Sequence, residues 1–333
     1  MARCLVRGSI NIDEFFHVRD IVRAGETTSS SGIETRAGGK GANQAVAVAK
    51  AGGHVDLVGA VGKDGLWVLR QLQEGLGVNV DEVAVADEQT GRAIIQLAES
   101  GENSIILYKG ANYTALETPE TLPSASHLLL QNEIPFSSTL AYLFLAYSEG
   151  IPTIFNPSPM PTPDELRTFP WAQVTWLLVN EGEAVDLLKA LGEPNITPFA
   201  APEAEGLPKT PSLLTSYSVI ARLSKHSSFA QTVNIICTLG SAGVLALLPS
   251  LSQPIYVPAA KLQGCVRDTT GAGDCFAGYL VAELMKLPKD MVLDEETMTG
   301  ILEICVQAAG ICVERRGAME SIPTRIEVLE RLR

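Results

Sequence analysis

Residues 268–274 read Asp-Thr-Thr-Gly-Ala-Gly-Asp, and a run of small and apolar residues, 275–285, follows them directly. This second run is typical of a buried helix, so the glycines stand at a helix start. Free N–H groups and the positive end of the helix dipole suit the negative charge that develops on a transferring phosphoryl group. Asp274, at the edge of this cradle, can accept a proton from an attacking hydroxyl. A plain capped helix start is the competing interpretation.

A second glycine cluster lies near the beginning of the chain. Residues 37–45 read Ala-Gly-Gly-Lys-Gly-Ala-Asn-Gln-Ala, and the pattern predicts a helix over 41–51 that stops at Gly52-Gly53. Glycines let a backbone pass close to a ligand, and the free N–H groups of the helix start favour oxygen-rich or anionic ligands. The cluster is not a Walker loop, because Gly41 follows Lys40 where Ser or Thr is required. A simple turn is the alternative.

A third polar cluster ends the first predicted strand. Residues 8–13 read Gly-Ser-Ile-Asn-Ile-Asp, so Asn11 and Asp13 point to the same side of an extended chain. Sheets of α/β proteins bind ligands at the carboxyl ends of their strands, and paired polar groups there suit hydroxyl recognition. A capped turn explains the same residues without a ligand.

The rest of the chain alternates short apolar runs with helical patterns, which predicts a doubly wound, mostly parallel central sheet flanked by helices. The predicted strands are 4–9, 55–61, 127–131, 152–155, 176–179 and 233–238, and the predicted helices include 41–51, 66–74, 137–149 and 181–191. Two β-prone stretches break this rhythm and predict a small β-sheet lid, with strands within about 13–40 and 88–112. Residues 193–212 carry five prolines and read as an insertion loop within a single domain, 1–333.

The amino-acid composition limits the kinds of partner and environment that we expect for the protein. The formal net charge of -13 repels phosphate backbones, which argues against nucleic acid. The six cysteines form no Cys-x-x-Cys pair and are expected to be free thiols. We see no signal peptide and no apolar run of roughly 18 residues, so we expect no membrane span. The expected location is the cytoplasm, with the nucleus as an additional one.

Taken together, residues 38–43 and 268–274 resemble the two signatures of the ribokinase-like carbohydrate kinase family. The match extends through 8–13, 90–91, 101–103, 110–112, 180–183 and 238–243, and it covers most of the chain except about 193–231. Within the family, the run from Gly38 to Gln44 with the Asn-x-Asp pair is more similar to the ribose enzymes than to those that act on adenosine or fructose. Val306 departs from the polar or aromatic residue that many members place near adenine.

The resemblance implies ATP-dependent phosphorylation of a small sugar, D-ribose at O5, with Asp274 as the catalytic base. It implies an anion hole at Gly271, Ala272 and Gly273. It assigns the sugar, besides Asp274, to Asn11, Asp13, Gly39, Lys40, Asn43 and Glu133. It assigns ATP and Mg²⁺ to Asn180, Glu183, Gly273 and the loop Thr238, Leu239, Gly240, Ser241, Ala242 and Gly243. It assigns an activating K⁺ to Asp268, Thr270, Cys312, Arg315, Gly317 and Ser321, with backbone carbonyls as ligands at Thr270, Cys312, Arg315 and Gly317.

Other functions remain open, both among kinases of this family and outside them. The substrate could be another sugar, such as a different pentose, fructose or a keto-sugar acid, or a nucleoside. A non-catalytic sugar-binding regulator is a further alternative, against which the intact Asp274 and its glycines argue. The resemblance also implies a homodimer through the lid, whose edge strands would otherwise be unprotected.

Overall fold

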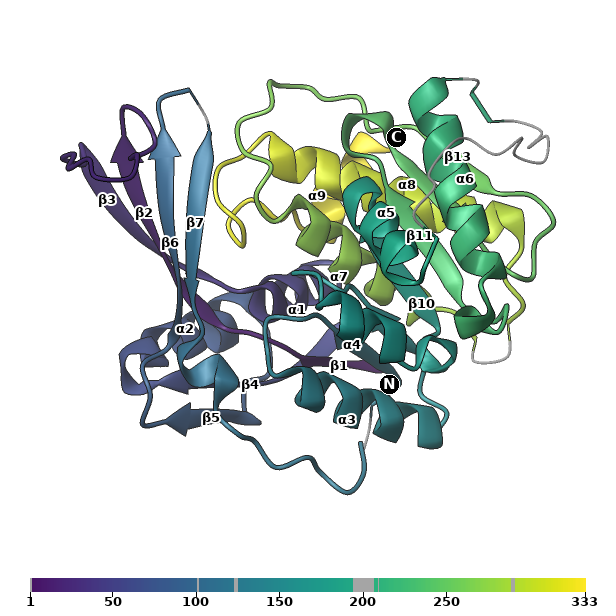
Figure 1. The fold of residues 1–333 in the computed structure, drawn as a ribbon, viewed down its shortest axis with the longest axis horizontal. Coiled ribbons are helices and arrows are strands. Elements are labelled where there is room, and N and C mark those ends of the chain that lie inside the picture. Colours follow the sequence, from purple (N-terminus) through teal and green to yellow (C-terminus); the bar gives the residue numbers. More distant parts are fainter. Residues whose placement is uncertain (1, 101, 123–124, 194–206, 209, 289–290) are drawn as a thin grey trace.

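The computed structural model describes residues 2–333 except 101, 123–124, 194–206, 209 and 289–290. Its centre is a nine-stranded sheet in the order β13-β12-β11-β10-β9-β8-β1-β4-β5, and Figure 1 shows helices on both of its faces. The strands from β11 to β5 pair in parallel, whereas β12 and β13 are antiparallel at one end. The bounds are β1 Arg3–Arg7, β4 His54–Gly62, β5 Val83–Ala86, β8 His127–Leu130, β9 Thr153–Phe155, β10 Trp176–Asn180, β11 Asn234–Thr238, β12 Val244–Leu247 and β13 Ile255–Val257.

Side chains alternate between the two faces of the sheet and form two apolar cores. On β8, Leu129 packs into one core, whereas Leu128 and Leu130 pack into the other, as the period of a strand requires. One core is covered by α1 Lys40–Lys50, α2 Leu66–Arg70, α7 Ala272–Leu284, α8 Glu295–Val313 and α9 Arg325–Arg331. The other is covered by α3 Phe136–Ser148, α4 Pro163–Thr168, α5 Glu181–Ala190 and α6 Pro211–Lys225. The predicted fold class is confirmed.

A separate four-stranded sheet forms the lid and projects from the body at the left of Figure 1. Its order is β3-β2-β6-β7, and its strands are β2 Asn11–Val18, β3 Gly32–Gly38, β6 Gly91–Ala98 and β7 Asn103–Tyr108. A small apolar cluster of Phe15, Ala93 and Ile95 packs between β2 and β6. The prediction for Asn11 and Asp13 was wrong in one respect: they begin the lid strand β2, not the end of β1. Residues 8–10 connect these strands, and a Cβ on Gly8 would lie 2.6 Å from the Cα of Gly41, so the connection passes close to the start of α1.

Three further segments differ from a simple reading of the sequence. The predicted loop 193–212 ends earlier than expected, because Pro211 begins α6 at a position that suits proline; residues 194–206 and 209 lie outside the described residues. The predicted helix 66–74 is α2 continued by a π-helical turn over Gln71–Gly75. Helix α8 is long and apolar enough to match a membrane span by length and composition, but half of its most apolar window is buried against the protein, as in a core helix.

Candidate active site

Polar groups from distant parts of the chain meet at one edge of the central sheet. Parallel strands end at the same edge, so the residues after β8, β9 and β10 lie near the starts of α1 and α7. Gln131 and Asn156 follow β8 and β9, and both lie within hydrogen-bond distance of Gln44 on α1. The two glycine clusters therefore meet in space, although 230 residues separate Gln44 from Asp274.

Asp274 is buried in the first turn of α7 and is held by two amide side chains of α1. Asn43 Nδ2 donates to Asp274 Oδ2 at 3.0 Å, and Gln44 Nε2 donates to Asp274 Oδ1 at 2.9 Å. Gln131 Nε2 in turn donates to Gln44 Oε1 at 2.6 Å, which fixes the orientation of the Gln44 amide. Each carboxylate oxygen thus has one donor and can accept a further hydrogen bond.

Asp13 and Asn43 each keep a buried oxygen atom without a hydrogen-bond partner. These atoms are Asp13 Oδ1 and Asn43 Oδ1, and both side chains are at least nine-tenths buried. Buried polar atoms in native proteins almost always have partners, so unpaired acceptors beside Asp274 indicate that a ligand with hydroxyl groups supplies them. The two atoms suit the sugar hydroxyls that the family resemblance assigned to these residues.

The pKa of Asp13 is raised to about 7. Burial is the largest cause, and the carboxylates of Glu133, Glu320 and Asp274 add to it. The guanidinium of Arg36, which faces Asp13 across the β2–β3 ladder, acts in the opposite direction. A lid carboxylate therefore changes its charge near neutral pH.

Gly39 and Glu133 shape the entrance to α1. Gly39 has φ 91°, and a Cβ there would lie 2.7 Å from the backbone N of Asn11, so only glycine lets α1 begin so close to β2. Glu133 Oε2 accepts from Lys40 N at 3.0 Å and from Ser9 Oγ at 2.6 Å. The Glu133 carboxylate thus caps the start of α1, besides the sugar contact that the sequence implied.

Lys40 lies among carboxylates at the junction of the two glycine clusters. Burial lowers the pKa of its ammonium, but three nearby carboxylates outweigh burial and raise that pKa. They belong to Asp274, Glu133 and Glu183. Lys40 is therefore a firmly charged cation beside the candidate base, where it can stabilise an anionic ligand.

A cavity of about 210 Å³ joins this cluster to the residues assigned to the nucleotide. Its lining includes Lys40, Asn156, Asn180, Glu183, Thr238, Thr269, Gly271, Gly273 and Asp274. The cavity thus brings together part of each assigned set: Lys40 and Asp274 of the sugar set, Gly271 and Gly273 of the anion hole, and Asn180, Glu183 and Thr238 of the nucleotide set. The other residues assigned to the sugar, Asn11, Asp13, Gly39, Asn43 and Glu133, do not line it.

Three backbone N–H groups at the start of α7 are free. Gly271 has φ 76°, which turns the chain sharply into the helix. Ala272 N donates to Thr269 O at 3.3 Å, whereas the N–H groups of Gly271, Gly273 and Asp274 donate to no described residue. The donors available to an anion are therefore those of Gly271, Gly273 and Asp274, with the N–H of Ala272 already engaged.

Asn180 and Glu183 bind each other at the start of α5. Asn180 Oδ1 accepts from Glu183 N at 2.8 Å, and Glu183 Oε2 accepts from Asn180 N at 2.9 Å, which is a capping box. Both residues still line the cavity. Among the described residues no group of three or more His, Cys, Asp or Glu side chains could hold a metal ion. Mg²⁺ bound mainly through phosphates and water suits such a site.

The loop after β11 turns back tightly into β12. Gly243 has φ 100°, and a Cβ there would lie 2.1 Å from Val257 O, so this position requires glycine. Gly240, Ser241 and Ala242 form a single 3₁₀ turn whose residues are not buried. Leu239, in contrast, is buried in the apolar core, so its side chain supports the loop from behind. Of this run, the cavity described above includes Thr238.

The six residues assigned to a monovalent cation lie close together: Cys312 Sγ is 4.0 Å from Thr270 O, and Arg315 N donates to Cys312 O at 3.0 Å. Asp268 accepts from Thr270 N at 2.9 Å and from Gly317 N at 3.0 Å. Ser321 Oγ lies 2.9 Å from Cys312 Sγ. Arg315 directs its side chain away, to Glu327, so only its backbone could take part. The carboxylate, hydroxyl and carbonyl oxygens gathered here are the ligand types that a hard cation prefers.

Sequence reasoning missed Gln44, Gln131 and Asn112. Gln44 orients Asp274, and Gln131 orients Gln44. Asn112 accepts from Ile10 N at 2.8 Å and donates to Asn11 Oδ1 at 2.7 Å, which fixes the Asn11 amide in the lid strand. Gln44 stands inside the quoted 37–45 cluster and Asn112 inside the matched 110–112 run, so both carried a signal.

The comparisons with known proteins agree with this geometry. The family model described as pfkB family carbohydrate kinase matches residues 1–325. The chain belongs to the pfkB family of carbohydrate kinases. A ribokinase of Schizosaccharomyces pombe is 32% identical and the match covers 98% of this chain and 97% of that protein.

Solved pfkB-family structures share the whole fold. A ribokinase from Cryptococcus neoformans var. grubii serotype A in complex with ADP has 51% sequence identity and a TM-score of 0.87, with 99% of each chain covered. An Arabidopsis thaliana ribokinase complexed with ribose and ATP has 30% identity and a TM-score of 0.78, with 100% of this chain and 99% of that chain covered. As a pfkB-family enzyme, this chain is a phosphotransferase that acts on an alcohol group.

Proposed function

We propose that the protein phosphorylates D-ribose at O5 with ATP, giving ribose 5-phosphate and ADP. One observation carries this proposal: the cavity that joins Lys40 and Asp274 to the free N–H groups of Gly271 and Gly273. The unpaired oxygens of Asp13 and Asn43 beside it suit a ligand rich in hydroxyl groups. Full-length relatives that are ribokinases support ribose as the sugar.

The residues of the site divide the reaction between them. Asp13 and Asn43 accept hydrogen bonds from sugar hydroxyls, and Lys40 attracts the phosphates. Asp274, oriented by the two amides of α1, accepts the proton of the attacking hydroxyl. The N–H groups at the start of α7 stabilise the charge of the phosphoryl group during transfer. Asn180 and Glu183, which line the cavity, would hold Mg²⁺ through water, and the ion would neutralise phosphate charge.

A panel of sugars and nucleosides tests the substrate. Each compound is assayed with magnesium-ATP and K⁺, and the product is identified by mass and by the position of the new phosphate. Ribose should be phosphorylated far faster than other pentoses, fructose, keto-sugar acids or nucleosides. Preference for one of those compounds would change the substrate, and sugar binding without turnover would favour a non-catalytic regulator.

The raised pKa of Asp13 predicts a pH-dependent affinity for ribose. Below about pH 7 this carboxyl is protonated and neutral, and above that pH it is ionised. Hydrogen bonds to a charged acceptor are stronger by about 1 kcal/mol than bonds to a neutral one, which is roughly a fivefold change in affinity. The KM for ribose should therefore rise several-fold as the pH falls from about 8 to about 6.

The Asp13→Asn variant separates this effect from other titrations. Its side chain stays neutral, so its KM for ribose should be high and nearly constant over the same pH range. Steady-state kinetics at saturating ATP measure both profiles. A variant that retains the pH dependence of the unchanged enzyme would assign that dependence to another group.

We also propose that a monovalent cation, K⁺ by resemblance, binds between the loop at Asp268 and Thr270 and the loop at Gly317 and Ser321. The gathered oxygen atoms support this site. A cation there would fix the segment that begins α7, so kcat should rise severalfold or more when K⁺ replaces Na⁺ at equal ionic strength. Equal rates in the two salts would remove the cation from this account.

We propose, finally, that two copies pair through their lids. The outer lid strands expose Ile33 on β3 and Ile105, Ile106 and Leu107 on β7, each about half exposed or more. Exposed apolar edge strands are usually covered by a partner. Light scattering should give a dimer mass, and a monomer at micromolar concentration would contradict the proposal.

A further inference from the structure

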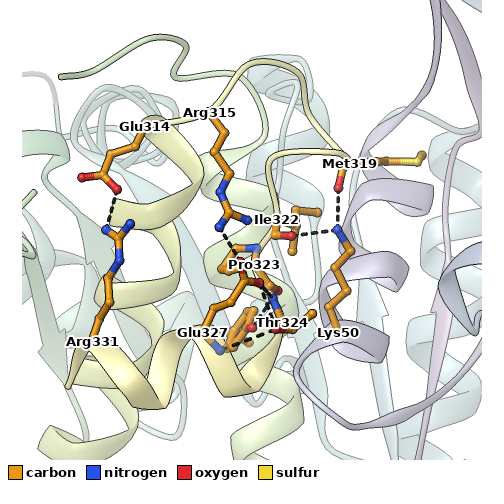
Figure 2. A network of polar contacts seen from close by, with 10 residues as sticks. Lys50, Glu314, Arg315, Met319, Ile322, Pro323, Thr324, Glu327 and Arg331 are labelled. Atoms are coloured by element: carbon orange, nitrogen blue, oxygen red, sulfur yellow. Dashed lines mark hydrogen bonds and ion pairs between the residues drawn. The ribbon is translucent and has the colours of Figure 1, made fainter. Parts of the chain in front are cut away.

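Residues 314–324 connect α8 to α9 and are called here the α8–α9 loop. Figure 2 shows how ion pairs and hydrogen bonds hold this loop and its flanks. Arg315 pairs with Glu327 of α9 at 2.5 Å, and Arg331 pairs with Glu314. These two pairs anchor the beginning of the loop to the last helix.

Lys50, the last residue of α1, holds the middle of the same loop. Its Nζ donates to Ile322 O at 2.7 Å and to Met319 O at 3.1 Å (Figure 2). No other described residue donates to either carbonyl. The side chains of Met319 and Ile322 are fully buried, so their backbone is packed on one side and tied to an ammonium on the other. Charge-assisted hydrogen bonds of this kind are among the stronger ones in proteins.

The α8–α9 loop backs directly onto the start of α7. A Cβ built on Gly271 would lie 2.9 Å from the Cα of Ala318, so loop backbone and helix start are in contact. Gly317 N donates to Asp268 Oδ2 at 3.0 Å, which ties the loop to the segment that precedes Gly271. A displacement of Ala318 would therefore move Gly271 and the free N–H groups that follow it.

Helix α1 links the two ends of this arrangement. Its first turns carry Lys40, Asn43 and Gln44, of which two orient Asp274, and its last residue is Lys50. Because a helix is rigid, α1 keeps the Asn43 and Gln44 amides, which orient Asp274, at a fixed position relative to Lys50 and the α8–α9 loop that it holds.

We propose that Lys50 is a positioning residue for phosphoryl transfer. Its ammonium holds the α8–α9 loop against Gly271 and Asp268, and thereby fixes the N–H groups that face the transferring phosphate. The inference rests on the proposed kinase function. It concerns kcat more than ribose affinity, because the two hydrogen bonds of Lys50 go to the loop behind Gly271 and to none of the residues assigned to the sugar.

Lys50→Met tests the role, since methionine keeps much of the length of the side chain and removes the charge and the donors. Misplacement of a catalytic group by about 1 Å can cost about 100-fold in rate, so we expect kcat to fall about 10- to 100-fold. The KM for ribose should stay within about threefold. Lys50→Arg keeps a cation and donors and should recover most of kcat.

Hydrogen–deuterium exchange gives a readout that does not depend on turnover. In Lys50→Met, peptides that cover 268–274 and 314–324 should exchange faster than in the unchanged protein, and those of α3 and α4, which cover the other core, should not. If the unchanged protein fails to phosphorylate ribose, the proposed function fails, and the exchange data still decide whether Lys50 holds the loop.

Arg331→Met is the matched control. It removes an ion pair of the same network, with Glu314, but no donor to the loop carbonyls. It should lower the melting temperature and leave kcat nearly unchanged. Should Lys50→Met fail to fold, Lys50→Gln is judged by the same criteria. A Lys50 variant with the original kcat, or an equal loss of kcat in Arg331→Met, would overturn the proposal.

Discussion

Replacing Asp274 with Asn is expected to reduce kcat by about 10²- to 10⁴-fold, the usual contribution of a positioned general base. The amide cannot accept the proton of the sugar hydroxyl. It also places an NH₂ group against Asn43 Nδ2 or Gln44 Nε2, both of which donate to the carboxylate. The variant therefore loses both the base and part of the network that orients it. Turnover is measured with saturating ribose and ATP.

Ribose binding to the same variant should survive, with an affinity within about tenfold of the original. Calorimetry in the absence of ATP measures it, since no reaction can then occur. Asp13→Asn is a matched control, because it makes the same chemical change in a carboxylate that would hold the sugar. It should raise KM more than it lowers kcat. If Asp274→Asn behaved like Asp13→Asn, Asp274 would be a sugar ligand and the base would lie elsewhere.

The parts of this site that sequence predicts are those set by local chemistry. At each helix start the glycines lie within a few residues of the functional side chain, in Gly-Gly-Lys-Gly and in Gly-Ala-Gly-Asp. Lys40 and Asp274 could therefore be found without a structure. The alternation of apolar strands and helices likewise predicts a parallel sheet, and a parallel sheet brings the ends of β1, β8, β9 and β10 to one edge.

The parts that sequence does not predict depend on contacts between distant segments. Gln44 is one amide among many until Asp274, 230 residues later, packs against it. Gln131 acquires its role only through Gln44, 87 residues earlier. β1 ends at Arg7 and β2 begins at Asn11, and the backbone of Gly8 packs against that of Gly41, a contact between distant segments that residues 8–13 alone do not reveal.

Glu183 can both stabilise the start of α5 and take part in the active site. Its position in the first turn of α5 suits the helix dipole, and its carboxylate completes a capping box with Asn180. The same side chain lines the cavity and raises the pKa of Lys40. A capping acid at the carboxyl edge of the sheet can therefore also help to organise phosphates and their metal ion.

Gly271 and Gly273 at the start of α7 should differ in how alanine changes the melting temperature, although both variants should lose activity. Gly271 has a positive φ and no room, because a Cβ would lie 2.9 Å from the backbone of Ala318. Strain in the left-handed region costs about 1–2 kcal/mol, and the close contact adds to it. Gly271→Ala should therefore melt at a lower temperature and lose about 100-fold or more in kcat, because the N–H groups that face the phosphate move.

Gly273→Ala should not destabilise the protein. Gly273 has no positive φ, a Cβ there meets no atom within 4 Å, and alanine is the better helix residue by up to about 1 kcal/mol. Yet the methyl group would enter the cavity beside Asp274, in the space that the phosphates of ATP require. We expect an unchanged or higher melting temperature together with a KM for ATP raised at least tenfold and a reduced kcat.

Gly300→Ala provides the control for both variants. Gly300 lies in α8, has no positive φ and likewise meets nothing within 4 Å, but it does not line the cavity. Its alanine variant should match Gly273→Ala in stability and the unchanged enzyme in kinetics. A stable Gly273→Ala enzyme with full activity would show that phosphate does not approach the start of α7. Gly273→Ala should lose activity but not stability, whereas Gly271→Ala should lose both. That difference would show that Gly273 leaves space for the nucleotide, whereas Gly271 provides the backbone geometry of the helix start.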